Sequence, residues 1–325
     1  MGLDDYVNTF GVYCKRLHGQ RVKKLTIDAQ FTCPNRDGTL GVGGCTFCNV
    51  ASFSGERGRE QPIAIQLTEG KVRAQSAKKC TSSVNINTPP TAKYIAYFQA
   101  YTSTYDEYEV LKQKYDQALE DSDIVGLHIG TRPDCVPDQV IDLLVEYQQR
   151  GIEVWLELGL QTANDHTLKR INRGHLLCEY RRTVKNARAR GIKVCTHLIL
   201  GLPGETSIDY FNSLQTVLGI GVDGLKLHPL HVVEGSTMAK KWRYNAMQLL
   251  TLEEYAAEAA KLIRHTPKNI IFHRVTAYAK KPILLAPDWC AFRWDGLVAI
   301  VNELRDFGGQ GSALIASQPK TSWGE

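Results

Sequence analysis

The sequence predicts an α/β fold: a partial (β/α)6 TIM-like barrel with a mostly helical C-terminal extension. Apolar runs rich in β-branched residues alternate with longer stretches of helical periodicity through about residue 230. Strict alternation of this kind is typical of a parallel sheet with right-handed crossover connections. Polar and Gly/Pro-rich segments follow every expected strand, whereas an open doubly wound sheet usually uses only the loops at its switch point. These two observations together favour a ring of strands over an open sheet.

Each expected strand is a short apolar run, and each expected helix is a longer amphipathic stretch that follows a strand. In chain order, the strands cover residues 22–28, 93–99, 124–130, 153–160, 193–200 and 224–230. The helices between them cover residues 63–79, 107–119, 137–150, 167–190 and 208–218. Beyond residue 235 the alternation stops. There Thr251 and Glu254 form a capping-box pattern that predicts a helix to about residue 265, and another helix is expected over residues 297–306.

The length of 325 residues alone suggests about two domains. The count of strands and helices changes that expectation to one barrel with an addition at each end. We expect an N-terminal segment over residues 1–20, a barrel core over residues 21–235, and a C-terminal extension or lid over residues 236–325.

Polar side chains alternate with apolar ones in four of the expected strands. In strand 153–160, for example, Leu156 and Leu158 share one face and Glu157 lies on the other. The apolar faces should meet the helices, so the other faces point into the barrel. The inward-facing polar residues are then His128, Glu157, Gln161, His197, Lys226 and His228. Burying so many polar groups is costly unless something pairs with them, which favours open space with a ligand over a hydrogen-bonded polar core without one.

Composition excludes several classes of protein. With 43% hydrophobic residues the chain can form a real core, and no apolar run approaches the roughly 18 residues of a membrane span. The polar, acidic start is not a signal peptide, so we expect a cytoplasmic protein, in which disulfides rarely persist. The nine cysteines then indicate metal binding or catalysis for any tight cluster, and burial for the rest. The net charge of +5 permits a nucleic-acid partner without requiring one.

The strongest signal is a C-x11-C-x2-C array, formed by Cys33, Cys45 and Cys48 in the glycine-rich loop after the first strand. Three cysteines could bind zinc together with a fourth ligand such as Cys14 or His18, although neither has a familiar zinc-finger spacing. Three thiolates can also hold three irons of a [4Fe–4S] cluster and leave the fourth iron open. The glycines would let the backbone curl closely around such an object.

This arrangement resembles the radical S-adenosylmethionine (radical SAM) enzymes, whose cysteine motif ends with an aromatic residue before the last cysteine, as Phe47 precedes Cys48 here. The long first gap resembles the subgroup of the Elongator catalytic subunit. Within that subgroup, the set of local motifs is similar to the YhcC family. The motifs are CPNRDGT, GGCTFCN, FQAYTST, TRPD, LELGLQT, INRGH and GLPGE. The similarity runs from about residue 10 to the end of the chain.

The resemblance implies that Cys33, Cys45 and Cys48 ligate a [4Fe–4S] cluster and that S-adenosylmethionine binds the open iron. It also implies a set of residues around S-adenosylmethionine: Phe47, Gln99, Tyr101, Thr102, Glu157, Gln161, His197 and Gly201. The family's Gly-Gly-Glu stretch is missing at residues 99–102, so backbone carbonyls or Gln99 would have to replace it. The catalytic residues are unknown from the sequence, and the candidates that could meet substrate are Lys226, His228 and Cys290.

For several of these residues a structural role is the alternative. Glu157 could form an internal ion pair with Lys226 and lie away from ribose. Glu205 could favour the N-terminus of the next helix. Arg132 and Asp134 could close their own loop and leave the substrate to other residues.

The implied partners are S-adenosylmethionine and an external electron donor of flavodoxin or ferredoxin type. The subgroup also suggests a tRNA uridine as substrate, with a small molecule as the alternative. Basic clusters that could meet RNA phosphates lie at residues 15–24, 240–243 and 280–281. Two other functions remain open: a non-catalytic iron–sulfur protein for electron transfer or redox sensing, and a zinc-stapled binding module.

Overall fold

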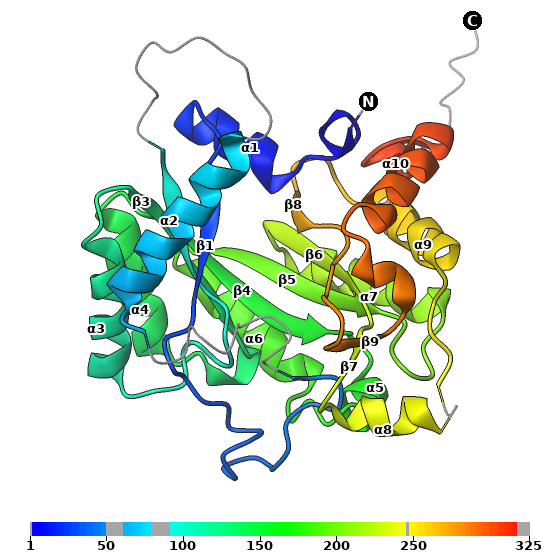
Figure 1. The fold of residues 1–325 in the computed structure, drawn as a ribbon, viewed down its shortest axis with the longest axis horizontal. Coiled ribbons are helices and arrows are strands. Elements are labelled where there is room, and N and C mark those ends of the chain that lie inside the picture. Colours follow the sequence, from blue (N-terminus) through cyan, green and yellow to red (C-terminus); the bar gives the residue numbers. More distant parts are fainter. Residues whose placement is uncertain (1, 50–60, 80–91, 245–246, 317–325) are drawn as a thin grey trace, which may run out of the picture.

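The computed structural model describes residues 2–49, 61–79, 92–244 and 247–316. These residues form a curled sheet of seven parallel strands in the order β1-β2-β3-β4-β5-β6-β8, a half-barrel (Figure 1). The strands are β1 (Lys23–Ile27), β2 (Tyr94–Phe98), β3 (Ile124–Thr131), β4 (Glu153–Gln161), β5 (Lys193–Leu200), β6 (Gly224–Pro229) and β8 (Ile271–Arg274). The predicted partial TIM-like barrel is therefore confirmed, and its six expected strands are all present.

Helices connect and surround these strands. They are α1 (Phe10–His18), α2 (Ile63–Lys79), α3 (Tyr108–Leu119), α4 (Asp138–Gln149), α5 (Asp165–Arg170), α6 (Leu177–Ala189), α7 (Ser207–Ile220), α8 (Thr237–Arg243), α9 (Leu252–Arg264), α10 (Asp295–Phe307) and α11 (Ser312–Ala316). A short antiparallel pair, β7 (Val232–Val233) and β9 (Leu284–Ala286), joins the loop after β6 to the C-terminal part. Among the described helices, none is long and apolar enough to cross a membrane.

Two sequence predictions are wrong in detail. The C-terminal extension, predicted to be mostly helical and without any strand assigned to it, contributes β8, which pairs with β6. The expected helix over residues 167–190 is two helices, α5 and α6. Between them Asn172 and Gly174 adopt left-handed backbone conformations, with φ of 51° and 75°, which end the helical path. The segment between the two helices turns back toward the cysteine loop.

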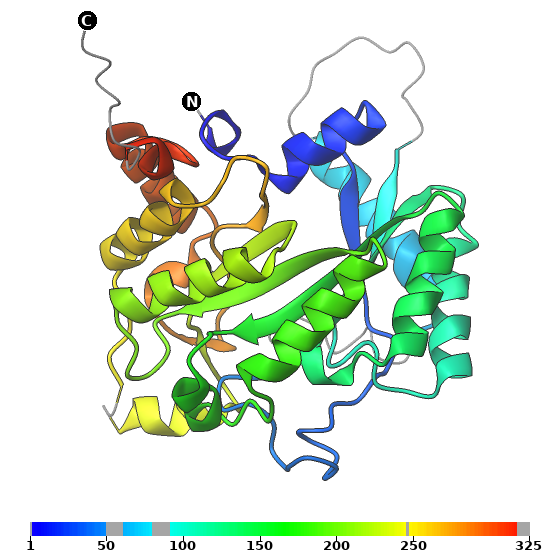
Figure 2. The ribbon, with the colours of Figure 1, turned by 180° about the vertical axis from the view of Figure 1, so that it is seen from behind.

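The main core lies between the sheet and the helices on its outer face, which Figure 2 shows covering the sheet from behind. The predicted alternation holds in β4, where Val154, Leu156, Leu158 and Leu160 belong to this core. Each is at most 1% exposed, so each contributes roughly 1.5–3 kcal/mol by leaving water. Because one face of the sheet packs in this core, the opposite face forms the interior of the barrel.

The amino-terminal end of the barrel is closed by α1. This helix begins after Thr9, whose hydroxyl accepts a hydrogen bond from the Val12 N–H at 3.2 Å. Its buried Phe10 and Cys14 pack against Ile95, Trp155, Cys195 and Ile271 on the inner face of the sheet. In Figure 1 the cysteine loop, drawn in blue, lies at the opposite end of β1 from α1. The barrel is therefore plugged at one end, and its polar loops gather at the other.

The C-terminal part packs beside the barrel. The capping box at Thr251 and Glu254 is present and begins α9 as predicted, with the Thr251 hydroxyl accepting from the Glu254 N–H at 3.2 Å. Helix α10 packs along α9, and the two carry buried apolar residues that complete the main core. The domain boundary at residue 235 stays a prediction.

Candidate functional site

A cavity of about 470 Å³ opens at the carboxyl ends of the strands. Most of the residues singled out from the sequence line it: Cys33, Cys45, Phe47, Cys48, Gln99, Tyr101, Thr102, Glu157, Gln161, His197, Lys226 and His228. Gly201 and Cys290 do not. Polar side chains from the loop after β1 and from all seven strands of the sheet thus converge on one space, as expected for a site at the carboxyl end of a barrel.

The cysteine loop is held by its own backbone and by distant segments. Within the loop, the Arg36 N–H donates to the Cys33 carbonyl at 2.8 Å, and the Cys48 N–H donates to the Cys45 carbonyl at 2.9 Å. Gly44 has φ of 79°, and a Cβ there would lie 2.7 Å from the Arg36 guanidinium, so the turn requires glycine. Outside it, the Thr46 N–H donates to the Ile171 carbonyl at 2.9 Å. These hydrogen bonds therefore hold the backbone of the cysteine loop in one conformation.

The three cysteines fit an iron–sulfur cluster better than a single metal ion. All three are free thiols that line the cavity. Four-coordinate zinc with bonds of about 2.3 Å would bring its sulfurs to roughly 4 Å from one another. Within the described parts of the chain, the three sulfurs do not form a group with separations under 4.8 Å. Cys14 lies in the plug at the other end of the barrel, so it cannot complete a zinc site with them.

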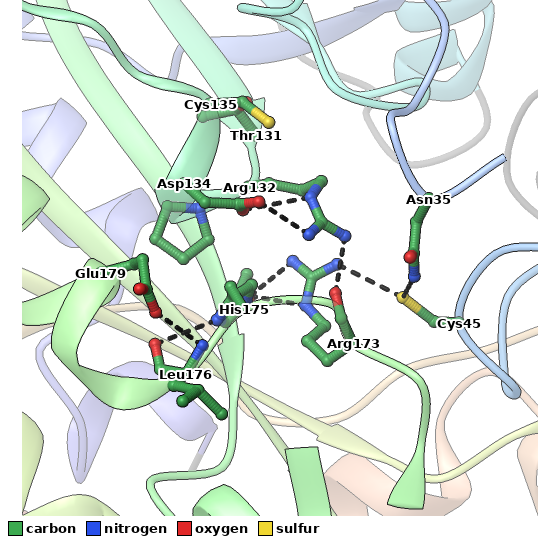
Figure 3. Close-up of polar contacts among 12 residues, drawn as sticks. Asn35, Cys45, Thr131, Arg132, Asp134, Cys135, Arg173, His175, Leu176 and Glu179 are labelled. Atoms are coloured by element: carbon green, nitrogen blue, oxygen red, sulfur yellow. Dashed lines mark hydrogen bonds and ion pairs between the residues drawn. The ribbon is translucent and has the colours of Figure 1, made fainter. Parts of the chain in front are cut away.

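Buried side chains surround the sulfur of Cys45. The Arg173 guanidinium donates to it at 3.4 Å, and the Asn35 amide donates at 3.7 Å (Figure 3). Arg173 is fixed in turn, because it donates to the Gly159 carbonyl at 2.6 Å and its own carbonyl accepts from Arg132 at 2.7 Å. A Cβ on Gly159 would lie 2.9 Å from that guanidinium, which explains the glycine in β4.

The sequence did not identify Arg173 or Asn35 as site residues, although both lie in the quoted motifs. Arg132 adopts the alternative role, since it pairs with Asp134 at 2.8 Å and closes its own loop. This ion pair also stabilises the carbonyl contact to Arg173. The motif TRPD thus supports the cysteine loop indirectly.

Glu157 is the centre of the barrel interior. Its fully buried carboxylate accepts from Lys24 at 2.7 Å, from Lys226, and from His197 at 3.1 Å. The Nδ1 atoms of His128 and His273 also contact this carboxylate, at 2.9 Å and 3.2 Å. These contacts are the interior ion pair that the sequence offered as the alternative for Glu157, and its role toward ribose stays a prediction.

The charges in this network set one another's protonation. Burial alone would raise the pKa of Glu157, but the ammonium groups of Lys226 and Lys24 hold that pKa well below its usual range. Burial lowers the pKa of Lys226 to about 8 despite the nearby carboxylate. His128, Glu157 and His273 offer ligand atoms within 4.8 Å of one another, yet the two ammoniums already occupy the carboxylate. The group is therefore an ion-pair network and not a cation site.

Two of the predicted cofactor residues have unusual backbone conformations. Tyr101 has φ of 60° and Gln161 has φ of 80°, both in the left-handed region that side chains other than glycine rarely adopt. At Gln161 the register between β4 and β5 also shifts. Such strain persists where the surrounding structure enforces it, and it clusters at ligand sites. Thr102 adds a second sign of a ligand, because its hydroxyl oxygen is buried without a hydrogen-bond partner.

The remaining predicted residues lie elsewhere. Gly201 has φ of 92° and packs against Leu230 and Leu250 beside the cavity. Cys290 is 1% exposed in a small apolar cluster with Leu284 and Ala279, and burial raises its pKa, so its thiol is not poised to react. His228 lines the cavity through β6.

Glu205 turns back toward the end of β4, where it accepts from the Thr162 hydroxyl at 2.6 Å. The start of α7 is capped instead by Thr206 and Asp209. Burial raises the pKa of the Glu205 carboxyl from 4.5 to about 7. The folded state therefore favours the protonated carboxyl. As the pH rises above about 4.5, Glu205 ionises more readily in the unfolded state, so the folded protein loses stability until this carboxyl also ionises in the folded state near pH 7.

We therefore expect Glu205→Gln to stabilise the protein at pH 8 by about 2 kcal/mol and to leave stability nearly unchanged at pH 5. Denaturant unfolding of both proteins at the two pH values measures the difference. A stability difference of equal size at pH 5 and pH 8 would contradict the assignment of this carboxyl.

A family model for the radical SAM superfamily matches residues 33–217, and a model for a radical SAM C-terminal domain matches residues 222–306. Protein YhcC of Escherichia coli strain K12 is 52% identical over 314 residues, which cover 97% of each chain. The tRNA uridine(34) acetyltransferase of Dehalococcoides mccartyi is 32% identical over 122 residues, which cover 37% of this chain and 26% of the relative.

Among solved structures, the archaeal Methanocaldococcus infernus Elp3 with an N-terminal deletion superimposes with a TM-score of 0.59 at 17% identity. The superposition covers 88% of this chain and 63% of that one. This similarity concerns the fold alone. It agrees with the half-barrel and with the packing of the C-terminal part against it.

Proposed function

Because the chain belongs to the radical SAM superfamily, we propose that it cleaves S-adenosylmethionine reductively and uses the resulting 5′-deoxyadenosyl radical to take a hydrogen atom from a substrate in the cavity. The chain is a radical SAM enzyme, and its cofactors are a [4Fe–4S] cluster and S-adenosylmethionine. The observation that carries the proposal is the convergence of three free cysteines and a polar inner face on one cavity.

In this proposal Cys33, Cys45 and Cys48 hold the cluster, and no fourth cysteine is needed because the open iron receives the cofactor. Arg173 and Asn35 orient the Cys45 sulfur by hydrogen bonds. Hydrogen bonds to cluster sulfurs raise the reduction potential, which makes an electron easier to accept. The buried setting of Cys45 keeps water away from that sulfur.

Other residues would position S-adenosylmethionine. The unpartnered Thr102 hydroxyl and the strained Gln161 line the same wall of strand ends as Gln99 and Tyr101. Their donors and acceptors suit the hydroxyl, amine and carboxylate groups of such a ligand. Phe47 packs in a small apolar cluster with Leu168 and Ile171, which keeps the loop's aromatic side chain beside the cavity.

The alternative of a non-catalytic electron carrier is not favoured. That function needs a fourth protein ligand, and the sequence offered Cys14 or His18 for it. Both lie on α1, and Cys14 is buried in the plug at the amino-terminal end of the barrel.

We further propose a flavodoxin or ferredoxin as electron donor and a tRNA uridine as substrate. The tRNA proposal is supported by the relative named tRNA uridine(34) acetyltransferase, of which this chain spans about a quarter. Lys24 does not belong to the predicted RNA-facing cluster at residues 15–24, because its side chain points into the barrel and pairs with Glu157.

The tRNA proposal predicts transfer of a substrate hydrogen to 5′-deoxyadenosine. The reduced, anaerobically reconstituted enzyme is incubated with S-adenosylmethionine and tRNA that carries deuterated uridines. Mass spectrometry should find deuterium in the 5′-deoxyadenosine, and the effect should weaken as salt rises, because RNA binding depends on phosphate contacts. Unlabelled product formed at the same rate with and without tRNA would exclude tRNA as substrate.

A further inference from the structure

A row of basic side chains crosses the inner face of the sheet on three adjacent strands. His197 of β5 pairs in register with Lys226 of β6, and Lys226 pairs with Arg274 of β8. Neighbouring strands lie about 4.8 Å apart, so the three residues share one level of the barrel. All three line the cavity.

Four of the cations that line the cavity have polar partners in the protein. Arg36 donates to the Cys48 carbonyl at 2.8 Å, and Lys226 donates to the Tyr97 hydroxyl at 2.9 Å and to Glu157. Arg132 pairs with Asp134, and Arg173 donates to the Gly159 carbonyl. Arg274 differs from them. It is exposed to the cavity and makes no hydrogen bond or ion pair with any residue that the structure describes.

Within the parts of the chain that the structure describes, no counter-ion faces Arg274 at this wall. Glu157 is the carboxylate among the described lining residues, and it is already surrounded by two lysines and three histidines. A guanidinium is always charged and presents donors in a fork that matches the oxygens of phosphate and carboxylate groups. Among the described residues, the wall therefore carries one charge without a counter-ion, and this charge suits an anionic ligand.

Two histidines beside Arg274 support this view. The rings of His228 and His231 are in contact, with centroids 4.6 Å apart. The Nε2 atom of His231 is buried and has no hydrogen-bond partner. Burial and the charge of Arg274 lower the pKa of His231 to about 4, so this imidazole is neutral at physiological pH. An unpartnered buried nitrogen is unfavourable, and an oxygen of a ligand that enters this wall could satisfy it after a small rotation of the ring.

We propose that Arg274 binds an anionic group of the substrate, a phosphate or a carboxylate, and that His228 and His231 form the wall beside it. This inference rests on the proposed function and adds the charge of the substrate to it. The group would belong to a nucleotide of RNA or to a small acidic metabolite. The carboxylate of S-adenosylmethionine is a third source of the same chemistry, which the experiment separates from the other two.

Binding of inorganic phosphate to the anaerobically reconstituted holoenzyme tests the site, measured by the broadening of the ³¹P resonance. Wild type should bind phosphate, and Arg274→Gln should weaken binding by at least about tenfold. Arg274→Lys should retain part of the affinity, because it keeps the charge and loses the fork. Lys185→Gln, which removes an exposed cation on α6 away from the cavity, serves as the matched control and should bind like wild type. Equal binding by wild type and Arg274→Gln, or no binding by wild type, overturns the proposal.

A second measurement separates the sources of the anion. The dissociation constant of S-adenosylmethionine should be the same in wild type and Arg274→Gln. A large loss of S-adenosylmethionine affinity in the variant would assign Arg274 to the cofactor and overturn the substrate assignment. If wild type binds phosphate but takes up no cluster, the proposed function fails while the anion site stands.

Discussion

Replacing Glu157 with alanine should destabilise the protein by about 3–5 kcal/mol, because it leaves buried cations without their counter-ion. The carboxylate is fully buried and contacts Lys24, Lys226 and three histidines, which come from five other strands. Lys226 is almost as buried, with 8% of its side chain exposed. Loss of the single negative charge would leave two ammoniums facing each other inside the barrel.

Denaturant unfolding at pH 7.5 measures this effect. Glu109→Ala, which removes an exposed carboxylate from the first turn of α3, is the matched control and should cost less than about 1 kcal/mol. The pKa of Glu157 is depressed in the folded state, so its contribution is present above about pH 4.5 and is lost as the pH falls further. A Glu157→Ala variant as stable as the control at pH 7.5 would show that the interior network is not needed for folding.

Replacing Cys33, Cys45 or Cys48 with alanine, one at a time, should abolish cluster binding and S-adenosylmethionine cleavage. Each position supplies one of the three thiolates that line the cavity, and the described residues of the fixed loop include no further cysteine to replace it. Iron and sulfide analysis after anaerobic reconstitution should fall from about four of each per chain to near zero.

Cys14→Ala and Cys195→Ala are the controls for this series. Both cysteines are buried at the amino-terminal end of the barrel, so both variants should keep the cluster. Loss of the cluster in Cys14→Ala but not in Cys45→Ala would contradict the assigned ligands and favour a site built around α1.

Much of the fold could be predicted from the sequence because the period of two in the strands is a local property. The alternation of Leu156 and Leu158 with Glu157 placed one face in the core and the other in the barrel interior, and the structure confirms both. The same rule applied to β1 would have turned Lys24 inward, since Leu25 and Ile27 belong to the outer core.

Other features could not be predicted because they depend on contacts between distant segments. β8 has four residues and is recognisable mainly by its pairing with β6. The approach of Arg173 to Cys45 joins residues 128 positions apart, after a turn that ends α5 early. The lack of a partner for Arg274 among the described residues depends on where the carboxylates of distant segments lie in the folded chain.

The formation of 5′-deoxyadenosine tests the central claim most directly. Wild-type protein, reconstituted anaerobically with iron and sulfide, reduced with dithionite and supplied with S-adenosylmethionine, should release 5′-deoxyadenosine and methionine in equal amounts. Cys45→Ala treated identically should release neither. A wild-type protein that carries a full cluster, binds S-adenosylmethionine and still forms no 5′-deoxyadenosine would contradict the account.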